Sequence, residues 1–440
     1  MELIVLFGAI AFIIFTTIRF KMHPVFSLTL TALLTGFFLG MSPEAIIKAM
    51  TEGFGKTLSG IGLVIAFGTV IGTYLEKSGA TTVLANVFLK AIGLKRSPLA
   101  LNLAGYVISI PVFCDSGFII LSSLNKALSK KTGLPMLVFA VSLATGLYAA
   151  HVFVPPTPGP LAAAAMLDAD LGTVLLLGLA VSLPVSLTGY IWARLIGKSL
   201  KSDSEVPEQD VLEQPQSPKP SAFQAFLPLL SPVVLIALKS IANYPTHPFG
   251  QEAFFKAIDF LGNPIIALLV GVLFAFLLGR KIVDDSKKTW VPLALKQAGL
   301  IILITGAGGA FGAILRTIDL AGLLALESGT GFSGLLIAFA IAALLKTAQG
   351  SSTVAIITTA AIFAPLLTAF SLTDTVEVAL TVLAIGAGAM TVSHINDSYF
   401  WVVSQFSGMD VKTALKGHSL ATLFQGLVGI GMILFLYLLL

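Results

Sequence analysis

The sequence predicts an all-α polytopic membrane protein with two inverted repeats, each of about five transmembrane helices plus a re-entrant hairpin. Of the 440 residues, 56% are apolar and only 11% are charged, whereas a soluble domain carries about 25% charge. Apolar runs of about 18 residues or more, long enough to cross a bilayer, recur from end to end. This composition excludes an ordinary soluble enzyme, a disordered chain and a nucleic-acid binder.

The first half, residues 1–196, begins with an apolar segment. Because this segment lacks a basic start and an Ala-x-Ala cleavage site, we expect the first membrane helix here and not a cleaved signal. Apolar composition predicts the elements of this half in order: spans near 3–18, 24–40 and 60–75, a broken pair at 98–111 and 114–128, a segment at 134–167 interrupted at 151–160, and a span at 172–195.

A polar linker follows at 197–222, with eight charges and four prolines in 26 residues. Such a stretch is typical of a solvated, cytoplasmic connection between membrane units. The second half, residues 223–440, then repeats the first: spans near 224–241, 263–279 and 299–316, a broken pair at 331–347 and 351–370, a segment at 376–409 interrupted at 393–400, and a last span at 414–439.

Two stretches of the halves resemble each other. GLVIAFGTVIGTYLEKSGA at 62–80 is similar to GLIILITGAGGAFGAILRTIDLAG at 299–322, and GLYAAHVFVPP at 146–156 is similar to GAMTVSHINDS at 388–398. This similarity suggests an internal repeat. The arms of each broken pair rise only about 21 Å, less than a hydrocarbon core of about 30 Å. Re-entrant hairpins are therefore favoured over the alternative of two full spans.

The basic residues support this topology. With the N-terminus outside and five true spans in each half, most of the 26 lysines and arginines fall on the cytoplasmic side, as the positive-inside rule requires. Because five is odd, the second half begins on the opposite side of the membrane, so the repeats are inverted. Lys346 lies within the second hairpin, and the outer side holds only Lys48, Lys56, Lys239, Lys256 and Arg316.

Four polar breaks interrupt the membrane segments, two in each half: 111–117, 151–160, 346–353 and 393–400. Irregular backbone at membrane depth is tolerated where it lines a cavity, and helix fragments that begin there present unpaired N–H groups to an anion. We therefore expect a midplane site for a carboxylate. The expected substrate-binding residues are Ser116, Gly117, Thr157, Lys346, Gln349, Ser351, Ser352, Thr353 and Asn396, and the expected proton-coupling residues are Asp115, His151, His394 and Asp397.

Each of these residues also has a purely structural interpretation. Asp115 could be a helix N-cap, His151 could satisfy backbone carbonyls at its break, and Lys346 could snorkel to the outer interface. The cluster at 394–397 could stabilise its break as a polar network. The remaining histidines, His23, His247 and His418, lie in or near loops in this interpretation and receive no role. We expect the glycine-rich GAGGAFG at 306–312 to pack helices and not to bind a nucleotide.

At these same segments the sequence resembles the gluconate:proton symporter (GntP) family of bacterial permeases. The matching pieces are IPVFCDSGFIIL (110–121), HVFVPPTPGPLAAA (151–164), TGAGGAFGAIL (305–315), LKTAQGSSTVA (345–355) and SHINDSYFWV (393–402). The resemblance implies proton-coupled uptake of a sugar acid across the inner membrane, an elevator-like motion of the hairpin-bearing part, and a homodimer. It places the family's motif positions at Asp115, His151, Lys346, Ser351, Thr353, His394, Asn396 and Asp397.

Three positions depart from the family pattern. Gluconate members tend to have His where this chain has Thr157, and Arg where it has Lys346, while Cys114 replaces a bulkier residue. Arg can form a bidentate contact with a carboxylate, whereas Lys cannot. A smaller hydroxy acid such as glycerate, or D-serine, is therefore the alternative substrate.

We accordingly expect a proton-coupled symporter in the bacterial inner membrane that imports gluconate or a related hydroxy-carboxylate. We expect a small anionic carboxylate, a proton and the lipid bilayer as its partners, and no nucleic acid, cofactor or metal. A channel would pass ions without coupling, and a membrane-embedded enzyme would need a nucleophile–base pair, for which no motif is found. No Walker motif is found either, which argues against an ATP-driven pump.

Overall fold

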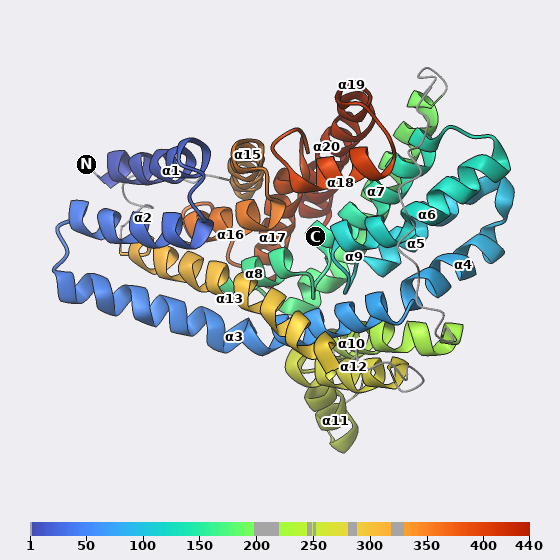
Figure 1. Cartoon of the computed structure of the whole chain (residues 1–440). Coiled ribbons are helices and arrows are strands. Elements are labelled where there is room, and N and C mark those ends of the chain that lie inside the picture. Colours follow the sequence, from blue (N-terminus) through green and yellow to red (C-terminus); the bar gives the residue numbers. More distant parts are fainter. Residues whose placement is uncertain (1, 198–219, 244–248, 250–251, 280–287, 318–329) are drawn as a thin grey trace.

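The computed structural model describes residues 2–197, 220–243, 249, 252–279, 288–317 and 330–440, and every regular element among them is a helix (Figure 1). The predicted linker at 197–222 lies almost wholly outside these residues. The helices that flank it end and begin where the composition changes, at Ile196 and Ala222.

The first half contains nine α-helices and one 3₁₀ turn at Leu94–Arg96 among its described residues. Their bounds are α1 Glu2–Arg19, α2 Pro24–Phe38, α3 Pro43–Lys77, α4 Ala80–Ile92, α5 Ser97–Ile108, α6 Cys114–Thr132, α7 Met136–Phe153, α8 Pro158–Met166 and α9 Leu171–Ile196. The predicted breaks at 111–117 and 151–160 are confirmed as the gaps between α5 and α6 and between α7 and α8.

The second half contains ten α-helices among its described residues. Its helices are α10 Ala222–Ala242, α11 Ala253–Leu261, α12 Pro264–Leu278, α13 Trp290–Leu315, α15 Gly331–Gln349, α16 Ser352–Phe363, α17 Thr375–Met390, α18 Ser398–Phe406, α19 Val411–Ala414 and α20 Leu420–Leu439, with a 3₁₀ turn at Ala364–Leu366 and a π-helical turn at Leu415–Ser419. The breaks predicted at 346–353 and 393–400 fall between α15 and α16 and between α17 and α18.

Local chemistry explains where many helices begin. Ser42 accepts a hydrogen bond from Ala45 N at the start of α3, and Asp170 accepts one from Thr173 N at the start of α9. Full capping boxes pair Ser221 with Gln224 and Asp374 with Glu377. These side chains satisfy backbone donors that have no partner within the helix.

Seven described helical segments are long and apolar enough to cross a membrane, and the bent pair α11–α12, with an angle of 68° between its arms, adds an eighth. The sequence predicts ten spans. Of these, α1, α2 and the α17–α18 segment are not among the eight, while the hairpin arm α15 is. At 19 residues, or about 28 Å, α15 is longer than expected. The helix continues past Lys346 to Gln349 and ends at Gly350, whose positive φ terminates it.

Two helices were not predicted from the sequence. Both α4 and α11 are short, lie between glycines or polar segments, and carry a lysine, at Lys90 and Lys256. At 13 and 9 residues, each is too short to register as a span on its own.

The two halves interlock along α3 and α13, which make the most extensive contact between them and run side by side in Figure 1. A Cβ atom at Gly53 of α3 would lie 2.5 Å from the carbonyl oxygen of Gly309 in α13. The glycine-rich segment at 306–312 therefore packs helices, as expected.

Two further kinds of contact recur in both halves. The α2 helix packs on α13 as α12 packs on α3, and α5 packs on α7 as α15 packs on α17. This reciprocity is what two similar repeats would give, and their inverted orientation stays a prediction. At the centre lies α7, all 18 residues of which are buried.

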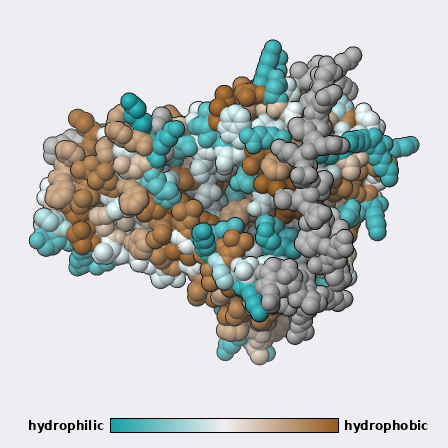
Figure 2. Space-filling view, in the orientation of Figure 1, coloured by the Kyte–Doolittle hydropathy of each residue, from teal (hydrophilic) through white to brown (hydrophobic). Residues whose placement is uncertain are grey.

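Apolar side chains cover the outside of the helical arms. In Figure 2 brown residues spread over the arm formed by α1 to α3 and over the lower lobe, which is formed by α10 to α12. Exposed members include Phe26, Phe38 and Leu63 in the arm and Leu273 and Phe276 in α12. Such faces suit contact with lipid rather than with water.

Candidate functional site

The first hairpin tip lies between Ile108 and Cys114 and brings Asp115 into the first turn of α6. The Oδ1 atom of Asp115 is buried and accepts no hydrogen bond from the residues that the structure describes. Ser116 follows it, and Gly117 is buried against α7, where a Cβ would lie 2.7 Å from Leu147 Cδ2. This tip therefore presents a carboxylate with spare acceptor capacity.

The second hairpin tip turns at Gly350, whose φ of +77° is a conformation that favours glycine. A Cβ at this position would also collide with the backbone oxygen of Asn396. Ser351 caps α16 by accepting a hydrogen bond from Val354 N at 3.4 Å, and Ser352 and Thr353 form the first turn of that helix. Both amide atoms of Gln349 are buried without a hydrogen-bond partner among the described residues.

Lys346 and Asp397 form a buried ion pair between the second hairpin and the α17–α18 break. Lys346 Nζ lies 2.5 Å from Asp397 Oδ2, and the side chains are only 1% and 5% exposed. The same ammonium donates to Gly350 O at 3.0 Å. Asp397 also caps α18, because its Oδ1 accepts from Tyr399 N at 3.0 Å. In this state the lysine that the sequence assigns to a substrate carboxylate binds a carboxylate of the protein.

The ion pair continues into a hydrogen-bonded chain that ends at His418. Ser393 Oγ donates to Asp397 Oδ2, and His418 Nε2 lies 3.1 Å from Ser393 Oγ. Because the one hydroxyl proton of Ser393 goes to Asp397, His418 Nε2 must be the donor in its contact with Ser393. His418 Nδ1 is then unprotonated in a neutral ring, and it has no partner among the described residues.

His418 was missed in the sequence interpretation, which placed it in or near a loop. It lies in the π-helical turn Leu415–Ser419, between α19 and α20, and is 0% exposed. Its ring packs on Tyr399, with centroids 5.4 Å apart. A π-turn inside a helix often marks a functional position, but no pattern of side chains announces one in a sequence.

His394 and Asn396 fasten the same break to the hairpin. His394 Nε2 lies 3.2 Å from Thr347 O, and Asn396 Nδ2 donates to that oxygen at 2.7 Å. Asn396 is exposed and His394 is partly exposed, so both lie at the edge of the buried ion pair. They connect the tip of α15 to the segment that carries Asp397.

The α7–α8 break contributes His151 and Thr157. His151 is buried, its Nδ1 has no hydrogen-bond partner in the described part of the chain, and its ring lies 6.2 Å from that of Phe113 at the first tip. Thr157 Oγ1 donates to Val154 O at 2.5 Å. The hydroxyl of Thr157 is therefore used within its own turn.

An aromatic cluster of Phe118, Tyr148 and Tyr399 joins helices that flank three of the four breaks, α6, α7 and α18. The ring of Tyr399 lies 5.3 Å from that of Tyr148 and 6.3 Å from that of Phe118. Tyr399 Oη donates to Ala144 O at 2.9 Å, which fixes α18 on α7.

The contacts of two tyrosines cross between the halves. Tyr148 Oη donates to Ala389 O at 3.3 Å, and Tyr399 Oη donates to Ala144 O at 2.9 Å. Residues that lie far apart in the two halves of the sequence thus share one buried polar region.

This region combines one satisfied ion pair with several unsatisfied polar atoms. Asp397 has hydrogen-bond partners on both oxygens, whereas three other groups lack partners among the described residues. Asp115 Oδ1 and Gln349 Oε1 can accept a hydrogen bond, Gln349 Nε2 can donate one, and His151 Nδ1 has no partner in either role. Because buried polar groups are costly when unpaired, this arrangement suits a small polar ligand that completes these bonds.

Comparison with known proteins gives one consistent result. The family model described as GntP family permease matches residues 1–439. The gluconate permease of Pseudomonas aeruginosa is 35% identical over 431 residues, which are 96% of this chain and 94% of that protein. The D-serine transporter DsdX of Escherichia coli K12 is 31% identical over 429 residues, with 96% and 95% covered.

A solved structure shares the fold. The YdaH transporter of Alcanivorax borkumensis, which has been described as having an unusual topology, superposes with a TM-score of 0.67 over 94% of this chain and 98% of that chain. At 14% sequence identity this likeness extends to the fold alone.

Proposed function

The chain belongs to the GntP permease family, and from this premise we propose that it imports gluconate or a related sugar acid by symport with protons. It is a transporter and not an enzyme, and it is a multi-pass protein of the bacterial inner membrane. The observation that carries the proposed mechanism is the buried ion pair between Lys346 and Asp397.

In the proposed binding step the substrate carboxylate replaces Asp397 on the ammonium of Lys346. Three features support this exchange. Lys346 lies at the hairpin tip, and Asp397 is its only anionic partner among the described residues. The other hydrogen bonds between the tip and the break are those of His394 and Asn396 with Thr347 O. A small opening of the hairpin would separate Lys346 from Asp397 and admit an anion of the same charge.

The displaced Asp397 then provides the coupling. An ionised carboxylate without a cation is very unfavourable in a buried site, and such a group takes up a proton instead. Binding of one substrate carboxylate therefore brings in one proton, and the pair crosses the membrane with no net charge. Ser393 and His418 supply a hydrogen-bonded route to Asp397 for that proton.

The other groups in the site would form hydrogen bonds with the hydroxyl groups of the substrate. Asp115, with its unpartnered oxygen, can accept a hydrogen bond from a substrate hydroxyl, and Gln349 can both donate and accept. Further hydroxyl contacts are proposed for the residues at the tips and at the break: Ser116, Ser351, Ser352, Thr353 and Asn396. His151 and His394 are proposed as further proton-coupling groups.

D-Serine is the second candidate substrate. It carries the same carboxylate for Lys346, and its ammonium would pair with the free oxygen of Asp115. Likeness to a D-serine transporter over 96% of the chain supports this candidate as well. A smaller hydroxy acid such as glycerate would use the same two anchors.

Uptake by the purified protein in lipid vesicles tests the proposed function. We expect labelled gluconate, glycerate or D-serine to accumulate against its gradient, unchanged, when an inward proton gradient is imposed. Accumulation driven by a sodium gradient alone would contradict proton coupling. Passive equilibration without accumulation would favour a channel.

We also propose that the halves are inverted repeats and that the protein is a homodimer. The reciprocal packing of α2 on α13 and of α12 on α3 supports the repeats. Accessibility of cysteines introduced at Lys90 and Lys256, which we expect on opposite sides of the membrane, tests the orientation. The mass of the protein in lipid nanodiscs tests the dimer.

A further inference from the structure

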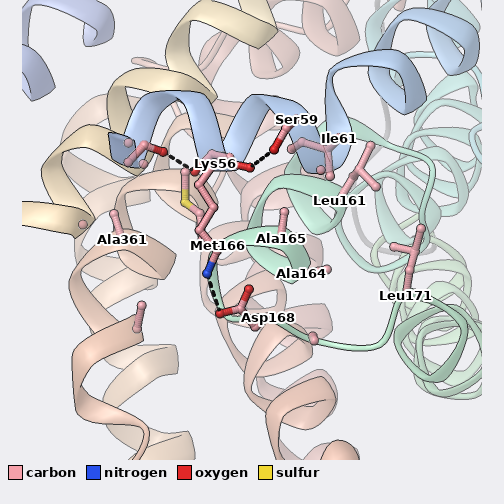
Figure 3. Close-up of a pocket in the computed structure, with 18 of the residues that line it drawn as sticks. Lys56, Ser59, Ile61, Leu161, Ala164, Ala165, Met166, Asp168, Leu171 and Ala361 are labelled. Carbon is pink, nitrogen blue, oxygen red and sulfur yellow. Dashed lines mark hydrogen bonds and ion pairs between the residues drawn. The ribbon is translucent and has the colours of Figure 1, made fainter. Parts of the chain in front are cut away.

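A cavity of about 490 Å³ lies away from the ion pair, between α3, α8, α13 and α16. Its volume falls within the range of roughly 300–1,000 Å³ that is typical of small-molecule pockets. Gly53, Gly60 and Gly309 form part of its wall, so backbone approaches the space closely, and Leu161 and Ala165 contribute one face of α8 (Figure 3).

The charged side chains that line this cavity are mostly basic. Lys56 and Arg316 are its cationic residues, and Asp168 is the one acidic residue among those that line it. Lys56 Nζ lies 3.2 Å from Asp168 Oδ2, and the two side chains meet across the space in Figure 3. Arg316 Nη2 donates to Met166 O at 2.6 Å, where α8 ends.

The ion pair in this cavity is unlike the buried one. Both partners are 65% exposed, so the pair contributes little to stability and is easily replaced by another anion. Asp168 also adopts a φ of +55°, at the turn that directly follows α8. Asp168 therefore belongs to a tight turn in the cavity wall, while Lys56 reaches it on a flexible side chain.

The cavity occupies a position on the expected route of a substrate. Lys56 and Arg316 both fall on the outer side in the topology that the distribution of basic residues predicts. The α8 helix runs from Pro158, which follows Thr157 at the α7–α8 break, to Met166 at this cavity. Leu161 in the cavity wall is therefore only four residues, or about 6 Å, from Thr157.

We propose that this cavity is an outer anion-binding vestibule, in which Lys56 exchanges Asp168 for the carboxylate of an incoming substrate. The proposal rests on the proposed function for the identity of the ligand, a small soluble carboxylate. Asp168 acts as an internal competitor, and Arg316 adds a fixed positive charge to the wall.

A labelling experiment that needs no transport tests the vestibule. Ala165→Cys introduces a thiol into the wall, and Gly60→Cys is a second reporter, because a Cβ there meets no atom within 4 Å. The unaltered chain is the blank, since its one cysteine, Cys114, is buried. A membrane-impermeant thiol reagent is added outside, with sodium D-gluconate as the probe and uncharged D-glucose as the control.

We expect D-gluconate to slow labelling at least fivefold and D-glucose to have no effect. Lys56→Ala should abolish the protection, and Asp168→Asn should give it at a lower gluconate concentration. Asparagine tolerates positive φ, so Asp168→Asn removes the competing charge without disturbing the turn. Because these two variants shift protection in opposite directions, an ion pair that merely stabilises the fold is distinguished from the proposed exchange.

Equal protection in the parent and in Lys56→Ala, or no protection by gluconate, would overturn the vestibule. A lipid headgroup is tested in nanodiscs: if phosphatidylglycerol blocks labelling relative to phosphatidylcholine and gluconate does not, the site binds lipid and the proposal fails. Vesicle uptake is measured in parallel. Protection without accumulation contradicts only the proposed function, and accumulation without protection contradicts only the vestibule.

Discussion

Lys346 at the end of α15 and Asp397 at the start of α18 form an ion pair of 2.5 Å that is almost wholly buried. The pair joins a hairpin tip to a helix break 51 residues further along the chain. In the proposed mechanism a substrate carboxylate replaces Asp397 on Lys346, and a proton replaces Lys346 on Asp397. The predictions below follow from this relationship.

Removing one partner of the pair should destabilise the protein, and removing both should not. Lys346→Met or Asp397→Asn alone leaves a buried group without its partner, which we expect to cost about 3–5 kcal/mol. The double variant keeps the α18 cap through the asparagine oxygen and should approach the stability of the parent. Unfolding midpoints in detergent provide the measurement. Additive losses in the double variant would show that the two charges do not interact, and no variant lacking Lys346 should bind a carboxylate.

The turn at Gly350 should be intolerant of any side chain. Gly350→Ala introduces a Cβ that collides with Asn396 O, so the hairpin tip must move away from the break. We expect transport to fall at least tenfold. Gly40→Ala is the matched control, because Gly40 has a similar φ of +75° with no atom within 4 Å of its Cβ position. It should cost only the conformational strain, about 1–2 kcal/mol, with transport intact. A similar loss of transport in both variants would attribute the effect to backbone strain alone.

Ser393 and His418 should act as one unit. His418 donates a hydrogen bond to Ser393, and Ser393 donates one to Asp397. Ser393→Ala and His418→Ala should therefore each lower the maximal uptake rate. The double variant should be no worse than the more impaired single one, since residues in one hydrogen-bonded network are not additive. Uptake rates in vesicles, measured for the parent, both single variants and the double variant, provide this double-mutant cycle. Additive losses would place His418 outside the route to Asp397.

Asp115 should affect recognition of the substrate more than coupling. Asp115→Asn removes the charge but keeps an acceptor oxygen, so we expect a raised KM for D-serine, whose ammonium loses its partner, and a smaller change for gluconate. Proton-driven accumulation should persist for both substrates. Asp410→Asn, at an exposed helix cap, is the control. Loss of proton coupling in Asp115→Asn would move the proton site from Asp397 to the first hairpin.

Much of this architecture could be predicted from composition alone. Long apolar runs locate helices such as α9, α10 and α13, and clustered polar residues and prolines locate all four breaks. These signals are local: a polar group inside an apolar run is costly in a membrane, so it marks a break or a functional position wherever it occurs. The short helices α4 and α11 were missed because, at 13 and 9 residues, neither is long enough to be recognised as a span on its own.

The pairing of the site residues could not be predicted in this way. Lys346 and Asp397 were recognised separately, but which charge neutralises which depends on how the hairpin folds against the break. His418 lies between Lys412, Lys416 and the start of an apolar helix, a context that indicates a loop. Its burial results from a π-turn and from packing on Tyr399, and both arise only in the folded chain.

The proton flux that accompanies substrate uptake tests the central claim most directly. Vesicles containing the parent protein or Asp397→Asn are given saturating substrate, while a pH-sensitive dye and labelled substrate report both fluxes. We predict one proton per carboxylate in the parent. In Asp397→Asn we predict continued exchange of substrate with no accompanying proton. An unchanged proton-to-substrate ratio in Asp397→Asn would contradict the account.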